Sequence, residues 1–242
     1  MAHRQTTDHY GFRYRGGENT RIEAFTDAAF AFAVTLLMIG GGHVPANVTQ
    51  LLAALRELPG YAASFLLLCL FWYAHYLWYR RYGIEDRRSI VLSLLLVFLV
   101  LIFVYPLHMM FSAAIFSAGG SAGAGAFQVR SWSDWRIMYE VFGIAYASMS
   151  AVILLLYLHA RSLRDPLGLD DAERLVTRSG VVRWAICTGV GVCSALLAAV
   201  LDLHAASGLY VLPGLFYMLL ALTGPLLRRN LRRGIAAAGA RA

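Results

Sequence analysis

The sequence predicts an all-α integral membrane protein, and three observations support that fold class. Of the 242 residues, 59% are apolar and only 14% are charged, whereas soluble domains carry about 45–50% apolar and about 25% charged residues. The apolar residues gather in blocks long enough to cross a bilayer, which takes about 20 residues of helix. The arginines lie almost entirely between alternate blocks. These patterns exclude an ordinary soluble domain, a disordered chain and a coiled coil.

Six apolar blocks are predicted to cross the lipid bilayer. They are Ile22–Ile39, Leu58–Trp78, Ser89–Phe111, Ile137–His159, Val181–Val200 and Leu209–Leu227. The first block is the least apolar, because Glu23 and Asp27 lie near its start. Pro59 and Pro213 fall in first turns, where a missing N–H is tolerated. Pro106 lies late in the third block and is expected to kink that helix or to end it early.

The arginines predict how the chain is oriented. All 21 basic residues are arginine. Eighteen lie in the two termini or in and beside the second and fourth connections, and only three lie on the opposite side: Arg56, Arg130 and Arg136. The positive-inside rule places the arginine-rich side in the cytoplasm. We therefore expect a multi-pass protein of the cell (inner or plasma) membrane with both termini cytoplasmic. The net charge of +7 follows from this topology and predicts neither a nucleic-acid partner nor a soluble substrate.

Three parts follow from this topology. Residues 1–20 are expected to form a cytoplasmic N-terminal segment, 21–227 a transmembrane domain, and 228–242 a basic cytoplasmic tail. The loops on the opposite side, among them Gly40–Gly42 and Ala118–Ala126, are short or glycine-rich. The chain therefore has no room for a soluble catalytic domain, and we expect no enzyme activity.

Other candidate motifs indicate packing rather than chemistry. Thr188–Val192 is similar to the filter loop of tetrameric potassium channels, but it lies inside a continuous block. Gly191 and Ala195 form a small-xxx-small pair, which predicts close contact between helices. No spacing is typical of a metal site or a cofactor site. The cysteines all lie inside apolar blocks and are expected to be free packing residues: Cys69, Cys187 and Cys193.

The first block has three faces when its residues are placed at 100° intervals. The small stripe comprises Ala24, Ala28, Ala31 and Thr35. The bulky stripe comprises Phe25, Ala29, Phe32, Leu36 and Ile39. The acidic stripe, roughly opposite the bulky one, comprises Asp27, Phe30, Val34 and Met38. An acid in lipid is costly, so the acidic stripe must face protein, whereas the bulky stripe is free to face lipid, another helix or a pore axis.

Asp27 and His75 are the two ionisable groups placed well inside the blocks. Asp27 lies six residues after Arg21, and His75 lies five residues before Arg80. Both groups therefore sit about 8–9 Å from the cytoplasmic boundary at 1.5 Å per residue. A carboxylate and an imidazole at one depth are natural partners, with Thr26, Trp72 and Arg21 as further polar candidates nearby.

The start of the first block resembles a family signature. Arg21, Phe25, Thr26 and Asp27, followed by alanine-rich residues and Thr35, are similar to the R-x-x-x-F-S-D signature of the lysosomal and endosomal potassium channel family, transmembrane protein 175. Trp72-x-x-His75 resembles the W-x-x-H pattern of its bacterial members. Six blocks with cytoplasmic ends are similar to one repeat of that family.

The resemblance implies a fold and a set of site residues. Family members line a central pore with their first helices, have no re-entrant filter loop, and form homotetramers when each chain holds one repeat. The implied constriction is Phe32, with apolar layers at Leu36 and Ile39, and Thr35 contributes to selectivity. Two residues depart from the family pattern: Thr26 replaces serine and keeps the hydroxyl, and Phe32 replaces isoleucine or leucine.

The sequence thus predicts a homotetrameric potassium-permeable cation channel in the lipid bilayer, with proton permeation left open. Permeation past an apolar constriction requires no cofactor, only K⁺ or another monovalent cation. The alternative is a proton-coupled secondary transporter that uses Asp27 and His75 as a relay. Such transporters show inverted repeats or broken helices, and neither is visible in this sequence. A non-conducting membrane protein of the same fold is a third possibility.

Overall fold

The computed structural model describes residues 7–8, 10–17, 20–39, 46–118, 131–200 and 212–239. These residues form seven helices: α1 (Arg21–Ile39), α2 (Val48–Arg56), α3 (Leu58–Tyr82), α4 (Arg87–Ala118), α5 (Trp132–Ser162), α6 (Asp171–Val200) and α7 (Leu212–Gly239). Within the described ranges, the β structure is limited to one isolated bridge, between Thr7 and Arg13. The all-α prediction is confirmed.

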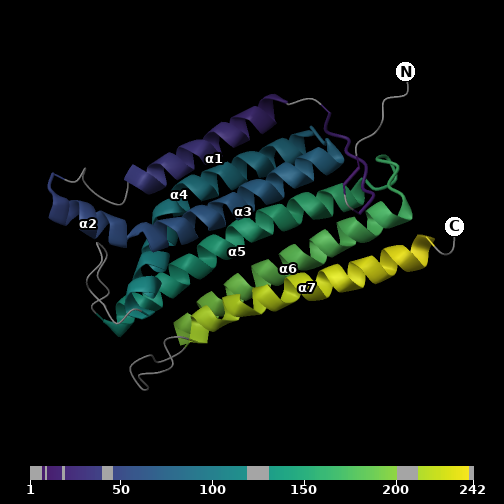
Figure 1. Ribbon diagram of the computed structural model, residues 1–242. Coiled ribbons are helices and arrows are strands. Elements are labelled where there is room, and N and C mark those ends of the chain that lie inside the picture. The colour runs from purple at the N-terminus through teal and green to yellow at the C-terminus, as the bar shows by residue number, and fades with distance from the viewer. Residues whose placement is uncertain are drawn as a thin grey trace.

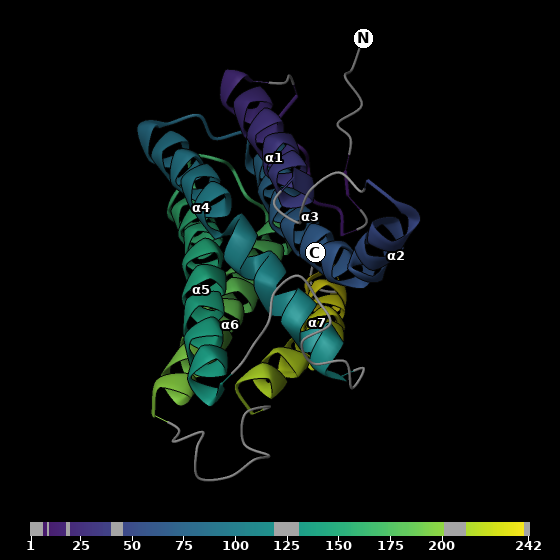
Figure 2. The same cartoon turned by 90° about the vertical axis from the view of Figure 1, so that its left-hand side faces the viewer.

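The six long helices lie side by side and run alternately in opposite directions, whereas the short helix α2 lies across one end (Figures 1 and 2). The start of α1, both ends of the α3–α4 connection, and the end of α7 lie at the same end of the bundle (Figure 1). This end holds Arg80, Arg87, Arg174 and Arg232, and we call it the arginine-rich end.

Five of the described helices are long and apolar enough to cross a membrane: α1, α3, α4, α5 and α6. They coincide with the first five predicted blocks. The sixth block, Leu209–Leu227, starts in residues 201–211, which lie outside the described residues, and continues as α7. Helix α7 is not among the five. The first five predicted spans are therefore confirmed as helices of spanning length and composition, and the sixth span stays a prediction. The basic segment from Arg228 is helical as far as Gly239.

The third predicted block does not end at its proline. Helix α4 continues past Pro106 to Ala118 as a helix of 32 residues. Two expected outer loops, Gly40–Gly42 and most of Ala118–Ala126, lie outside the described residues.

Helix α2 was not predicted from the sequence. This helix has only nine residues, too few to cross a membrane, and the side chain of Asn47 caps its start by accepting a 2.9 Å hydrogen bond from the Gln50 amide. An asparagine three residues before a glutamine is a helix-start signal. Apolar blocks predict only helices that are long enough to span a bilayer, and the nine residues of α2 are too few to form such a block.

Helices α5 and α6 pack through small residues. A Cβ atom on Gly143 would lie 2.8 Å from the Gly191 carbonyl oxygen, and one on Gly191 would lie 2.8 Å from the Ala147 amide nitrogen. The Gly191–Ala195 pair predicted as a packing motif thus faces Gly143 on α5. Close approach of the two backbones is the means by which membrane helices associate without a hydrophobic driving force between them.

The segment before α1 also folds onto the bundle, which the sequence did not indicate. Phe12 is fully buried and packs edge-to-face on Tyr82 at the end of α3, with ring centroids 5.4 Å apart. Arg13 and Arg15 both bind the buried carboxylate of Glu173 at the start of α6, at 3.0 and 2.7 Å. Residues 10–17, which we call the N-terminal arm, therefore tie α3 and α6 together at the arginine-rich end, directly before the chain enters α1.

Candidate functional site: the exposed stripe of the first helix

Helix α1 contacts its own chain mainly through α3 and α4. Its buried residues are Glu23, Thr26, Phe30, Ala33 and Leu37. A hydroxyl cap starts the helix, because the Glu23 amide donates to Thr20 Oγ1 at 3.3 Å. One face of α1 is therefore fixed to the bundle, and the remaining faces determine what the helix can do.

The bulky stripe lies on the face that the chain leaves uncovered. Phe25 is 53% exposed, Phe32 is 55% exposed and Ile39 is 66% exposed. Leu36 is half-buried at the edge of this face. Large apolar side chains that their own chain leaves uncovered must meet lipid, a second copy of the chain or a pore. This arrangement agrees with the predicted grouping of the residues.

The other stripes of α1 divide differently from the prediction. The small stripe, expected at a close helix contact, is exposed in the single chain at Ala24, Ala28 and Ala31. On the acidic stripe, Phe30 is buried but Met38 is 60% exposed. Of the buried residues of α1, only Phe30 belongs to a predicted stripe, and the others belong to none of the three: Glu23, Thr26, Ala33 and Leu37.

The two hydroxyl groups of the signature region bond to their own helix. Thr26 Oγ1 donates to the Ile22 carbonyl at 2.7 Å and is fully buried. Thr35 Oγ1 donates to the Ala31 carbonyl at 3.1 Å and lies on the exposed side. Thr26 is therefore a packing residue, while Thr35 stays beside the bulky stripe with both lone pairs of its oxygen free to accept from water or to face a cation.

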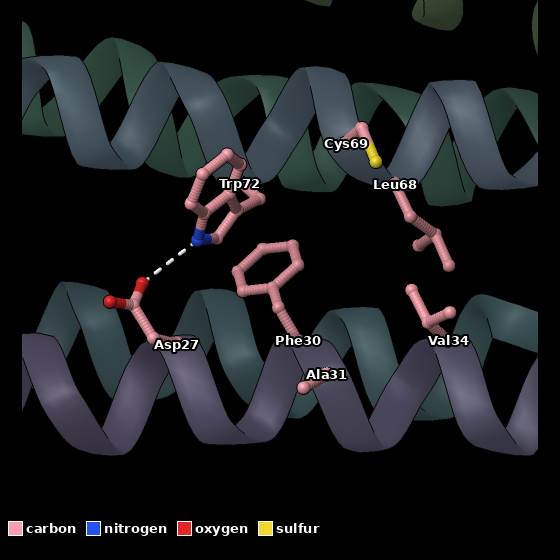
Figure 3. A pocket seen from close by; sticks show the side chains of 7 residues that line it. All are labelled: Asp27, Phe30, Ala31, Val34, Leu68, Cys69 and Trp72. Atoms are coloured by element: carbon pink, nitrogen blue, oxygen red, sulfur yellow. Dashed lines mark hydrogen bonds between the residues drawn. The ribbon is translucent and has the colours of Figure 1, made fainter.

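Asp27 binds Trp72 across the crevice between α1 and α3. The indole Nε1–H of Trp72 donates to Asp27 Oδ1 at 2.8 Å (Figure 3). Beside this bond, along the two helices, the crevice is about 300 Å³ in volume and is lined by apolar side chains, with Phe30 and Val34 on α1 and Leu68 and Cys69 on α3 (Figure 3). The bond links α1 to α3 on the side of α1 that faces away from the bulky stripe.

The predicted pairing of Asp27 with His75 is wrong. His75 is 2% exposed, and its Nε2 lies 2.9 Å from Ser93 Oγ on α4. Ser93 Oγ donates its only proton to the Ser89 carbonyl at 2.8 Å, so His75 Nε2 is the donor in the first bond. Position 75 is three residues beyond Trp72, which turns its side chain by about 60° on the helix, toward α4 instead of α1.

Two charged residues near the start of α1, Arg21 and Glu23, also belong to the site. Arg21 is exposed and makes no ion pair with any described acid, so it does not join Asp27 as the sequence suggested. It lines a cavity of about 550 Å³ at the arginine-rich end together with Arg15, Tyr79 and Glu85. Glu23 is 3% exposed, and its Oε2 has no hydrogen-bond partner within the described residues. In the sequence, Glu23 indicates only that the first block is less apolar than the others.

Comparisons with known proteins agree with this architecture. The family described as endosomal/lysosomal potassium channel TMEM175 matches residues 21–106. A potassium channel of Marivirga tractuosa is 29% identical over 215 residues, covering 86% of this chain and 85% of that protein. A potassium channel of Streptomyces collinus is 31% identical over 133 residues, covering 48% of this chain and 64% of that protein.

A solved structure shows the same fold. The crystal structure of a variant of the potassium channel MtTMEM175, in complex with a nanobody–MBP fusion protein, matches with a TM-score of 0.78 at 25% sequence identity. The match covers 94% of this chain and 100% of that chain. Fold and comparisons together define the class of protein as an all-helical, multi-pass membrane channel. The chain is a bacterial relative of the TMEM175 family, and the matched segment includes the site residues on α1 and α3.

Proposed function

We propose that this chain is one subunit of a potassium-permeable cation channel whose constriction is formed by the bulky stripe of α1. The observation that supports this proposal best is the exposure of Phe32 and Ile39 on a helix that is fixed to α3 and α4 through a different face. The potassium channels of Marivirga tractuosa and Streptomyces collinus support the choice of ion.

One α1 helix cannot enclose a pore, so the proposal requires several copies around an axis. We propose a homotetramer, in which four bulky stripes meet and the small stripe allows neighbouring subunits to approach closely. Phe32 forms the narrowest layer, Leu36 and Ile39 form further apolar layers, and Thr35 offers its hydroxyl oxygen beside them. An apolar ring controls permeation by excluding water, so a cation passes only when the ring is wetted.

The proposed orientation places the arginine-rich end in the cytoplasm of the cell, in the inner or plasma membrane, with α7 as the sixth span. The distribution of arginine supports this orientation through the positive-inside rule. Labelling of single cysteines from one side of intact cells tests it: Ser162→Cys, at the end of α5, reacts only from the cytoplasm, and Ser131→Cys, before α5, reacts only from outside. Reversed labelling contradicts the orientation.

Potassium flux from reconstituted vesicles tests the function. Vesicles loaded with potassium salt are diluted into potassium-free buffer without a pH gradient, and release is followed with a potassium electrode. We expect release that follows the potassium gradient, and a faster, less selective release from Phe32→Ala, because a wider ring stays wetted. Phe25→Ala, nearer the mouth on the same stripe, should change release less. Release that requires an imposed proton gradient, or that equals the release from protein-free vesicles, contradicts the proposal.

A further inference from the structure

A groove between α4 and α5 combines charged and apolar walls. Its volume is about 540 Å³. Arg87 and Arg88, at the first turn of α4, line its end at the arginine-rich side. The apolar part of the wall comes from both helices: Val91, Leu92, Leu155 and Leu158. His159 and Ser162, at the end of α5, add polar groups to the lining. Each arginine lies four residues, or about one turn, from an apolar residue of the groove on the same helix.

The two guanidinium groups are not neutralised by the protein. Both arginines are exposed, and neither side chain makes a hydrogen bond or ion pair with any residue that the structure describes. The nearest acid along the chain is Asp86. Its Oδ1 accepts from the Ser89 amide at 2.8 Å, and its Oδ2 lies 2.6 Å from His159 Nε2. Asp86 is therefore occupied as the helix cap and as the partner of His159.

The ionisation of Asp86 agrees with its bonding to Ser89 and His159 instead of to the two arginines. Burial alone would raise the pKa of this carboxyl group, but hydrogen bonds from Ser89 and His159 outweigh burial and leave the pKa below its ordinary value. Asp86 is thus held as a carboxylate, and both of its oxygens are directed at groups other than the arginines. Two positive charges remain at the mouth of the groove.

The apolar wall of the groove is also uncovered. Val91 is 54% exposed, Leu155 is 46% exposed and Leu158 is 39% exposed. All three lie on helices that qualify as membrane spans, and the arginines mark the level at which the span leaves the hydrocarbon. Charge at the boundary and apolar surface directly beneath it match the two parts of a phospholipid, which are a phosphate headgroup and an acyl chain.

We propose that this groove is a binding site for one anionic phospholipid, with its phosphate between Arg87 and Arg88 and an acyl chain along Val91 and Leu155. The inference concerns the membrane-facing surface and does not depend on ion permeation.

Native mass spectrometry of the protein in neutral detergent tests the site, with phosphatidylglycerol, phosphatidylcholine and free glycerol phosphate as the three probes. The test variant is Arg87→Gln with Arg88→Gln. The matched control is Arg232→Gln with Arg233→Gln, an adjacent exposed pair on α7 that gives the same change of charge. Val91→Trp fills the apolar part of the groove and leaves both arginines in place.

We expect the wild type to bind phosphatidylglycerol in preference to phosphatidylcholine. Loss of both groove arginines should weaken that binding roughly 25-fold, at about fivefold for each arginine near a membrane surface. Val91→Trp should weaken it as well, and the α7 control should change it less than twofold. Melting curves without lipid check that each variant folds as the wild type does.

Three results would overturn the proposal. Equal losses from the groove pair and the α7 pair would mean that net charge alone attracts the lipid. Undiminished binding by Val91→Trp would remove the acyl chain from the groove. Displacement of phosphatidylglycerol by an equal concentration of glycerol phosphate would make the arginines a site for free phosphate instead.

Discussion

The α5–α6 pair and helix α1 are both apolar, yet they use their surfaces in opposite ways. In the α5–α6 pair, Gly143 and Gly191 bring two backbones together so closely that neither position has space for a Cβ atom. In α1, large side chains such as Phe32 and Ile39 are left uncovered by the rest of the chain. The difference teaches that the contact between α5 and α6 is complete within one chain, whereas the uncovered face of α1 is the surface through which we propose that copies of the chain assemble.

The largest expected effect is on the completed contact. Gly191→Val places branched carbon atoms where a Cβ alone would lie 2.8 Å from the Ala147 backbone. Overpacking against backbone, which has no rotamer to change, should cost about 3 kcal/mol of unfolding free energy. Gly189→Val is the matched control, because nothing lies within 4 Å of that position. Thermal melting in detergent should separate the two variants clearly, and equal melting temperatures would refute the close contact.

A smaller effect is expected where α1 faces its own chain. Phe30 is 4% exposed and Phe32 is 55% exposed, two residues apart on one helix. The reference medium in a membrane is lipid, so Phe30→Ala loses mainly the cavity contribution, about 24 cal/mol per Å³ over roughly 100 Å³, or about 2 kcal/mol.

Phe32→Ala removes an uncovered side chain and should leave the melting temperature of the subunit nearly unchanged while raising ion flux. Melting and flux are measured on the same two preparations. The opposite assignment, with Phe32→Ala the less stable and Phe30→Ala the leakier, would mean that α1 is rotated from the orientation described above.

The smallest effect is expected for the hydrogen bond between Asp27 on α1 and Trp72 on α3. A double-mutant cycle of Asp27→Ala and Trp72→Phe should show a coupling of about 1 kcal/mol, the net worth of one hydrogen bond. The cycle of Asp27→Ala and His75→Ala should be additive within about 0.5 kcal/mol, because these groups have different partners. Coupling that is larger with His75 than with Trp72 would reverse the assignment, and it would restore the proton relay that a transporter needs.

The sequence predicts some of these features well because a strong physical constraint stands behind them. A bilayer demands about 20 apolar residues for each span, and five of the six predicted blocks are found as helices of spanning length and composition. Small residues one turn apart predict close packing, and Gly191 confirms it. The bulky stripe of α1 was predictable from helical periodicity alone, because large apolar side chains at spacings of four and three share one face.

Other features depend on rotations and contacts that no periodicity reports. Trp72 and His75 lie at similar depths along α3, so depth alone predicts either as the hydrogen-bond partner of Asp27. The rotation of α3 about its axis determines that Trp72 is the partner. The N-terminal arm has no apolar repeat, so Arg13 and Arg15 resemble topology markers, although both bind the buried Glu173.

Chemical modification of a cysteine at position 32 tests the central claim most directly. The chain is first freed of its own cysteines by Cys69→Ala, Cys187→Ala and Cys193→Ala, and Phe32→Cys is then added. A matched variant carries Phe98→Cys on α4, where the side chain is exposed to a similar degree, 57%. Both are reconstituted in vesicles, and potassium release is measured before and after treatment with a charged, thiol-reactive reagent.

If the bulky stripe of α1 lines the pore, modification abolishes release through the Phe32→Cys protein and leaves release through the Phe98→Cys protein unchanged. Unaltered release through a Phe32→Cys protein that mass spectrometry shows to be fully modified would contradict the account, because a pore lined by that residue cannot accommodate the added group and still conduct.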